Sequence, residues 1–355
     1  MNILFSTNCK LCVVALLLSF AACSGGGGST TATPTAEQPS TPVAGPQLTF
    51  EFNEPPFDLV GSNARFASNL SYGSNERHVL DLFLPDSDML TPLAIYIHGG
   101  GFTGGSKESA YVEGGDLIIR SLLAANIAFA SINYRLLSEN DPDGVIKPMT
   151  DSQNALQFLR YYADSLNIDK DAVGLLGGSA GAGTSLWLAF SDDRADPGNA
   201  DPILRESTRV LTAVAVETQG TYDLVRWETD VFVPFNITLD DLAQDPELAA
   251  RILSFNGIAD QSELFTQAGE QYRANIDMLA LMSADDPEFF VSNAVYAGSA
   301  PVGTQALLHH PRHGEVLLDR ANFLGVPSVV YLPQLGINDS SGENAVDFLI
   351  RKLNQ

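Results

Sequence analysis

Thiol groups are scarce in this sequence, and all of them lie at its start. The 355 residues include three cysteines, which are Cys9, Cys12 and Cys23. A domain built from the residues after Cys23 has neither a disulfide to stabilise it nor a thiol to act as a nucleophile. Its stability must come from a packed core, and a hydrophobic content of 45% can supply one.

Basic residues are also few. The chain has 19 lysines and arginines against 43 aspartates and glutamates, which gives a formal net charge of -24. A surface of that charge repels nucleic acids and anionic lipid headgroups, so we expect no nucleic-acid partner. The charge alone identifies no ligand.

The apolar run at the start of the chain is short. Leu11 to Phe20 follows Lys10 and precedes small residues, and it is too short to cross a bilayer. The next residues, Phe20-Ala21-Ala22-Cys23, resemble a bacterial lipobox, with phenylalanine where leucine is usual. Residues 1–23 are therefore predicted to be a lipoprotein signal peptide cleaved before Cys23, which would carry the lipid. An ordinary signal peptide cut nearby is the alternative.

A linker is predicted over residues 24–46, which are rich in Gly, Ser, Thr and Pro and have almost no core-forming residues. Ser24, rather than aspartate, directly after the cysteine resembles the outer-membrane sorting pattern. We therefore expect an exported protein anchored to the bacterial outer membrane, on its periplasmic or cell-surface side. The lipid would be its only contact with the membrane.

Residues 47–355 alternate short β-rich runs with helical periods, which predicts an α/β domain with a mostly parallel sheet covered by helices. The residues 226–286 break this alternation and have weak helical patterning. They are predicted to be a helical lid inserted between two strands, where it would wall the substrate pocket. The strands are expected at Val79 to Leu84, Leu93 to His98, Ile127 to Asn133, Val173 to Leu176, Leu211 to Glu217, Phe289 to Ser292 and Ser328 to Leu332.

The strongest chemical motif is Gly177-Gly178-Ser179-Ala180-Gly181, between the apolar run 172–176 and the helix-compatible run 182–190. A serine on such a strand-to-helix turn projects its hydroxyl into a cleft, and the flanking glycines prevent collisions within the turn. Ser179 is therefore predicted to be a nucleophile, and the Ala180 amide is predicted to face the reacting carbonyl. A glycine-rich turn without chemistry is the alternative.

A second motif, His98-Gly99-Gly100-Gly101-Phe102, directly follows a predicted strand. Consecutive glycines let bare amides point at a substrate oxygen, so Gly100 and Gly101 are predicted to complete an oxyanion hole with Ala180. His98 is expected to brace this loop rather than act as a base. A phosphate-binding nest is disfavoured, because no lysine follows in P-loop spacing.

With these two motifs the chain resembles the α/β-hydrolase superfamily, in particular the bacterial carboxylesterases and lipases of the feruloyl-esterase-like branch. The resemblance implies an α/β-hydrolase fold with an eight-stranded, mostly parallel sheet. It covers residue 80 to the end of the chain. Further segments that match are Leu80-Asp81-Leu82-Phe83-Leu84-Pro85, Gly104-Gly105-Ser106-Lys107, Ile132-Asn133-Tyr134-Arg135-Leu136 and Ile168-Asp169.

The chain departs from the family in the later catalytic positions. The family places an acid after strand seven and a histidine after strand eight. Here the residues 293–308 contain no carboxylate, and the residues 333–344 contain no histidine. Three histidines, His309, His310 and His313, cluster ahead of a predicted helix. We expect one of them to be the base, with His309 first and His310 second. The alternatives are a structural cluster and a metal site, and we expect no metal because no carboxylate lies in ligand spacing.

The carboxylate partner of this base is predicted to be Asp339, in the loop after strand eight, with Asp223 after strand six as the fallback. Such a carboxylate would accept the imidazole N–H and stabilise the imidazolium. This arrangement exchanges the two residue types between the two loops.

The function expected from these residues is hydrolysis of a small carboxylic ester through an acyl-enzyme on Ser179, with no cofactor. A serine peptidase of the same fold is an alternative, because the same motif supports amide cleavage. A binding protein that kept the fold and lost its catalytic residues is a second alternative.

Overall fold

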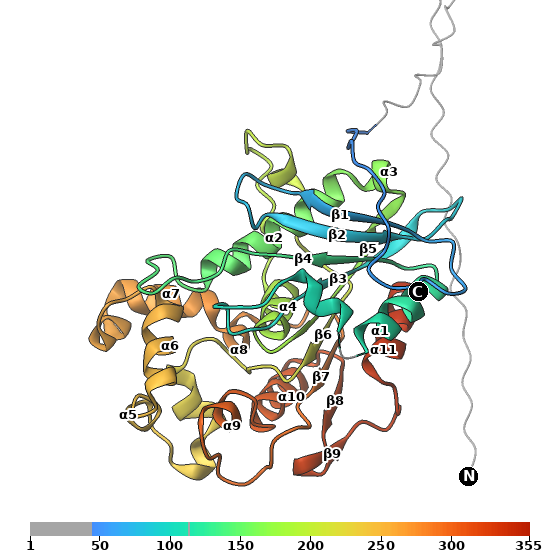
Figure 1. Ribbon diagram of the computed structural model, residues 1–355. Helices are drawn as coiled ribbons and strands as arrows, with labels where there is room; N and C mark the ends of the chain where they lie inside the picture. Colours follow the sequence, from blue (N-terminus) through green and yellow to red (C-terminus); the bar gives the residue numbers. More distant parts are fainter. Residues whose placement is uncertain (1–44, 113) are drawn as a thin grey trace, which may run out of the picture. The chain divides into compact units, whose positions relative to one another are not determined.

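The computed structural model describes residues 45–355 except residue 113, and Figure 1 shows their arrangement. The predicted signal peptide, the lipidation site Cys23 and residues 24–44 of the predicted linker lie outside the described residues.

Nine strands form one sheet in the described part of the chain, in the order β1-β2-β4-β3-β5-β6-β7-β8-β9. Neighbouring strands from β4 through β8 are parallel, whereas the pairs β1 with β2, β2 with β4 and β8 with β9 are antiparallel. The sheet is therefore mostly parallel, as predicted. The strands are β1 Arg65–Ser71, β2 Val79–Leu84, β3 Thr91–Ile97, β4 Ala128–Ile132, β5 Ile168–Gly178, β6 Thr212–Val216, β7 Phe289–Ser292, β8 Ser328–Leu332 and β9 Ile337–Asn338.

The ninth strand differs from the expected eight. After β8, a 3-10 turn at Pro333–Leu335 and Gly336, whose φ is 74°, reverse the chain. Ile337 and Asn338 then pair antiparallel with the end of β8 at the edge of the sheet. A strand of two residues is too short to show an alternating hydrophobic pattern, so sequence periodicity could not detect it.

Helices cover both faces of the sheet (Figure 1). One face packs against α2, α4 and α10, and the other packs against α1 and α11. The alternation of side chains along each strand supplies both cores, because Leu82 faces the first layer and Phe83 faces the second. The helices are α1 Gly115–Ala124, α2 Ile146–Tyr161, α3 Ala163–Leu166, α4 Ala180–Phe190, α5 Leu239–Leu242, α6 Pro246–Asn256, α7 Gln267–Ile276, α8 Met278–Leu281, α9 Thr304–Leu308, α10 Arg312–Leu324 and α11 Ala345–Leu353.

The insertion between β6 and β7 is helical. All of the residues 226–286 are described; they hold α5 to α8 with shorter turns, and none is in a strand. Local signals define these helices. Thr238 forms a capping box ahead of α5, Asp245 caps the start of α6 with Pro246 at its first position, and Gly257 ends α6 in the left-handed region.

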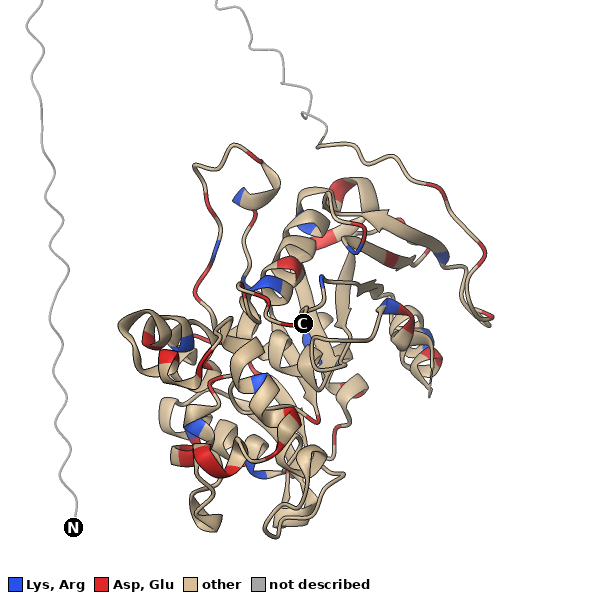
Figure 2. Cartoon of the chain, turned by 60° about the vertical axis from the view of Figure 1, so that its left-hand side comes forward, with Lys and Arg blue, Asp and Glu red and all other residues tan. Residues whose placement is uncertain are grey.

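Charged residues are spread over many helices and loops (Figure 2). Acidic residues occur in helices and in loops of the described chain. Among the described residues, no helix is both long enough and apolar enough to cross a membrane.

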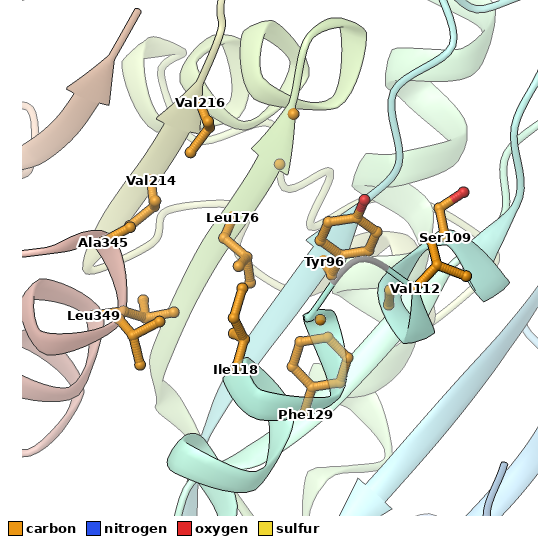
Figure 3. A pocket seen from close by; sticks show the side chains of 15 residues that line it. Tyr96, Ser109, Val112, Ile118, Phe129, Leu176, Val214, Val216, Ala345 and Leu349 are labelled. Carbon is orange, nitrogen blue, oxygen red and sulfur yellow. The ribbon is translucent and has the colours of Figure 1, made fainter. Parts of the chain in front are cut away.

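An apolar cavity of about 550 Å³ lies on the α1 and α11 side of the sheet (Figure 3). Its walls include Tyr96, Ile118, Leu176 and Leu349. Gly177 and Gly178 also line it, but none of the predicted catalytic or oxyanion residues does. The predicted chemistry therefore lies elsewhere.

Candidate active site

The predicted nucleophile lies on a sharp turn between β5 and α4. Ser179 has φ 52° and ψ -118°, a conformation that costs a non-glycine residue free energy. Its amide donates to the Val216 carbonyl at 2.9 Å, which ties the turn to β6. A Cβ atom on Gly177 would lie 2.4 Å from the Gly181 carbonyl carbon, and one on Gly181 would lie 1.9 Å from the Ile97 oxygen. Glycine is therefore required at both positions for the turn to close.

His309 faces this serine. It directly follows α9, and its Nε2 lies 2.9 Å from Ser179 Oγ. The ring of Tyr296 stacks on the imidazole with centroids 5.9 Å apart. Burial lowers the pKa of His309, a hydrogen bond with the Gln305 carbonyl opposes that shift, and the charge of Arg251 adds to it. The imidazole is therefore neutral at pH 7, and its Nε2 can accept the serine proton.

The other two histidines of the cluster have structural contacts. The Arg312 amide donates to His310 Nδ1 at 3.2 Å, so Nε2 carries the proton and donates to the Ser299 carbonyl at 3.0 Å. His313 is arranged in the same way between the Gly220 amide and the Leu307 carbonyl. Both side chains are fully buried, and burial lowers the pKa of His313 to about 3. His310 therefore has no free nitrogen for the base role that the sequence analysis gave it as second choice.

The structure does not bring Asp339 to His309. Its carboxylate accepts the Ser341 amide at 2.8 Å, and its own amide donates to the Val330 carbonyl. The reversal after β8 explains this position, because β9 is the outermost strand and β6, β7 and β8 separate it from β5. The expected pairing required the loop after β8 to stay beside the nucleophile turn.

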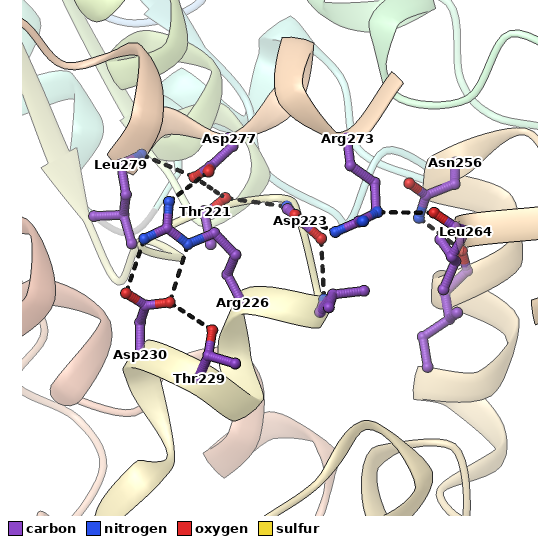
Figure 4. A network of polar contacts seen from close by, with 12 residues as sticks. Thr221, Asp223, Arg226, Thr229, Asp230, Asn256, Leu264, Arg273, Asp277 and Leu279 are labelled. Carbon is purple, nitrogen blue, oxygen red and sulfur yellow. Dashed lines mark hydrogen bonds and ion pairs between the residues drawn. The ribbon is translucent and has the colours of Figure 1, made fainter. Parts of the chain in front are cut away.

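The fallback acid, Asp223, also has another partner. Arg273 of α7 donates to it at 2.8 Å, and the neighbouring Arg226 bridges Asp230 and Asp277 (Figure 4). This network joins the residues after β6 to the inserted helices. Among the described residues, no carboxylate is hydrogen-bonded to His309, whose orientation rests on the Gln305 carbonyl and the Tyr296 ring.

The loop that carries His309 is anchored on the ends of β6 and β7. Asn293, the first residue after β7, exchanges two hydrogen bonds with the Thr218 backbone, at 2.8 and 3.1 Å. Glu217 accepts the Ala294 amide at 2.7 Å. An amide side chain thus lies where the family resemblance implied an acid, and it holds the loop instead of pairing with an imidazole.

The predicted oxyanion glycines adopt conformations that favour glycine. The φ angles of Gly100 and Gly101 are 101° and 59°. None of the hydrogen bonds among the described residues uses the amides of Gly100, Gly101 or Ala180, so these three N–H groups are free to donate. His98 braces the loop, since its Nδ1 lies 2.7 Å from the Gly99 oxygen and its ring stacks on Tyr134.

These groups line one small cavity of about 240 Å³. It brings Ser179, His309 and the three candidate oxyanion amides together with residues that the sequence analysis did not single out. Those added residues come from the loop after β6, from α6, and from α9; they are Gln219, Arg251, Phe255, Gln305 and Leu308. A lone arginine or glutamine in a helical insertion has no sequence signal that could have assigned it to the cavity.

A metal ion has no obvious place here. Within residues 45–355, leaving aside residue 113, no group of three or more His, Cys, Asp or Glu side chains could hold one. The three clustered histidines use their nitrogens for the protein contacts described above.

Part of this chain is similar to known esterases. Isoprenylcysteine alpha-carbonyl methylesterase of Arabidopsis thaliana is 32% identical over 116 residues, which is 32% of this chain and 25% of that protein. Acetylcholinesterase of Gallus gallus is 37% identical over 100 residues, 26% of this chain and 12% of that protein. The match spans no more than about a third of the length of these curated relatives.

Solved structures share the fold. A truncated carbohydrate esterase from gut microbiota superposes with a TM-score of 0.56 at 17% identity, covering 82% of this chain and 96% of that one. A bacterial heroin esterase gives 0.51 at 18% identity, with 84% of each chain covered.

The family model BD-FAE matches residues 80–267. That match is more than half of the chain and contains the glycine-rich loop at residues 99–101, the turn at Ser179 and α6. The chain therefore belongs to the BD-FAE family, and it has the fold of the esterase structures above.

Proposed function

We propose that this protein is a carboxylic ester hydrolase that forms an acyl-enzyme on Ser179, with His309 as its base and the amides of Gly100, Gly101 and Ala180 as its oxyanion hole. The observation that carries the proposal is the 2.9 Å contact between Ser179 Oγ and His309 Nε2. An alcohol is almost fully protonated at neutral pH, so a neutral imidazole at this distance supplies what the serine lacks.

The proposed reaction has two steps, acylation of Ser179 and hydrolysis of the acyl-enzyme. Ser179 Oγ attacks the ester carbonyl as its proton moves to His309 Nε2, and the free amides stabilise the resulting oxyanion. The imidazolium then protonates the leaving alcohol, and the acyl group remains on Oγ. Water attacks the acyl-enzyme as His309 again takes a proton, and the imidazolium returns that proton to Ser179 Oγ as the acyl–Oγ bond breaks and the acid leaves.

A fluorophosphonate probe tests this proposal. We expect it to label Ser179 stoichiometrically in the folded protein, because the probe requires an activated serine. A panel of p-nitrophenyl esters of increasing acyl length and an aminoacyl anilide then separates esterase from peptidase. The small cavity predicts a preference for short acyl groups. If the folded protein does not react with the probe, both the esterase and the peptidase hypotheses are wrong, and the hypothesis of a non-catalytic binding protein remains.

The pH dependence of kcat/KM follows from the state of His309. Because burial lowers its pKa below the ordinary value, the base stays neutral above about pH 6.5 and is protonated only in acid. We expect kcat/KM for a neutral ester to rise through a single pKa below 6.5 and then remain level to pH 8. An apparent pKa of 7 or higher would contradict this assignment.

Unfolding in acid is the control for that profile. Since burial also lowers the pKa of His310 and His313, the unfolded chain binds more protons than the native one below about pH 6.5. Native stability then decreases as the pH falls. Circular dichroism at each pH separates loss of fold from protonation of the base.

Crowding at Gly100 gives a separate prediction. An alanine Cβ there would lie 2.4 Å from the Gly104 oxygen, and φ is 101°, so Gly100→Ala must displace the oxyanion loop. We expect kcat to fall by roughly 100-fold with a small change in KM, because the oxyanion exists only in the transition state. Gly61→Ala is the matched control, since Gly61 has φ 80° with open space around it. An effect confined to KM would count against the loop's role.

The location of the enzyme is a further part of the proposal. We propose that Cys23 carries a lipid anchor, on the strength of the lipobox-like segment and the linker that follows it. Cys23→Ser should then release active enzyme from the membrane fraction, measured by fractionation after a salt wash. If the variant still sediments with membranes, something other than Cys23 attaches the protein.

A further inference from the structure

The catalytic cavity has a charge opposite to that of the whole chain. Acidic residues outnumber basic ones by 43 to 19 in the sequence, yet no Asp or Glu is among the described residues that line this cavity. Arg251 of α6 lines it, and its neighbour His309 is neutral at pH 7. An ester that enters the cavity therefore meets one cation and no carboxylate.

The Arg251 guanidinium lies directly over the oxyanion loop. Its Nη1 donates to the Gly101 carbonyl at 3.3 Å, and a Cβ on Gly101 would lie 2.4 Å from that nitrogen. The side chain is 15% exposed, and its Cζ lies 5.8 Å from the centroid of the Phe255 ring. The cation is therefore held at the wall where the ester carbonyl must bind.

Protein groups compensate this charge poorly. Its carboxylate partner is Glu247, one turn earlier on α6, at 2.6 Å, and that side chain is 46% exposed. Water screens the exposed carboxylate of Glu247 and weakens this pair. Arg251 Nε is buried without a hydrogen-bond partner among the described residues. By contrast, Arg273, which is buried to a similar extent, is paired with the buried Asp223.

We propose that Arg251 is a specificity residue that selects esters bearing a carboxylate close to the scissile bond. This inference rests on the proposed function and names its substrate class. The planar guanidinium matches a carboxylate geometrically, and in a partly desolvated cavity the pair is stronger than in water. The small volume requires the carboxylate to lie within a few bonds of the ester.

Two substrate pairs test this inference, each differing only in a carboxylate or its neutral amide. Monomethyl succinate against methyl succinamate places the charge on the acyl side, and acetoxyacetate against acetoxyacetamide places it on the alcohol side. We expect the wild-type enzyme, at low salt, to favour the carboxylate member of at least one pair by about tenfold or more in kcat/KM. A preference for the amide in both pairs would overturn the inference.

Variants assign that preference to one side chain. Arg251→Gln should lower the ratio of carboxylate to amide kcat/KM by roughly 10- to 100-fold, and Arg251→Lys should keep part of it. Arg205→Gln changes the net charge equally at an exposed site outside the cavity, so its ratio should match the wild type. If Arg251→Gln slows both members of a pair equally, Arg251 serves the transition state or the helix, and the specificity role is wrong.

The proposed function is tested separately in the same samples. Turnover of the neutral amide-bearing esters and fluorophosphonate labelling of Ser179 report on catalysis whatever the charge preference. Wild-type enzyme that is labelled and turns over both members without favouring the carboxylate would refute this inference alone. Protein that is neither labelled nor active would refute both.

Discussion

Replacing Ser179 with alanine is expected to lower kcat/KM for an activated ester by at least about a thousandfold, because no acyl-enzyme can form. The oxyanion amides and the cavity would remain, so a small residual rate above that of water is expected. Ser179 occupies a strained turn and its hydroxyl faces the cavity, so the loss of one oxygen should leave the melting temperature nearly unchanged.

Ser185→Ala is the matched control for this variant. Ser185 lies in α4, the helix that follows the Ser179 turn; it is buried and donates to the Gly181 carbonyl at 2.9 Å, outside the cavity. We expect it to keep a rate close to the wild type, with any cost appearing as lost stability. Turnover by Ser179→Ala above a tenth of the wild-type rate would end the nucleophile assignment.

Replacing His309 with alanine should cause a loss of similar size, on the order of a thousandfold in kcat, because Ser179 then has no group to accept its proton. The mutation also removes the contact with the Tyr296 ring. Fluorophosphonate labelling of Ser179 should slow in parallel, since the same activation drives that reaction. Rates near the wild type would show that the serine is activated by another group.

His310 and His313 provide the comparison. The Nδ1 of each imidazole accepts a hydrogen bond from a backbone amide, and its Nε2 faces a backbone carbonyl. Both rings also pack against aromatic rings. Alanine at either position would therefore leave a buried amide and a buried carbonyl without a partner. We expect stability to fall by about 1–3 kcal/mol for each unpaired group, with little loss of rate per labelled serine. Thermal melts and active-site titration with the probe separate the two effects.

The missing carboxylate has a physical consequence for this dyad. A carboxylate beside the imidazole normally stabilises the imidazolium that forms in the transition state. His309 instead has a hydrogen bond with the Gln305 carbonyl. This carbonyl orients the ring, but it has no full negative charge to stabilise the imidazolium. The same absence lets burial keep the pKa low, so the enzyme is expected to work in mildly acidic conditions as well as at neutral pH.

Much of the fold could be predicted from the sequence because its signals are local. The seven strand ranges expected from alternating and apolar runs agree with β2 to β8 within a few residues, apart from β5, which begins earlier. The turn that holds Ser179 was also predictable, because a glycine-flanked serine between a strand and a helix has few conformations. The two short or irregular edge strands were not, since β9 has two residues and β1 contains a bulge.

The sequence by itself determined the fold class, the turn that carries Ser179 and the glycine-rich loop at residues 99–101, because each depends on neighbours within a few residues. Only the tertiary structure decided which histidine reaches the serine, since His309 and His310 are adjacent and differ only in the direction of their side chains. The tertiary structure also places Asp339 beside the outermost strand, away from His309, and Arg251 in contact with the glycine-rich loop at Gly101. Those positions depend on how segments far apart in the sequence pack together, and local sequence patterns do not predict that packing.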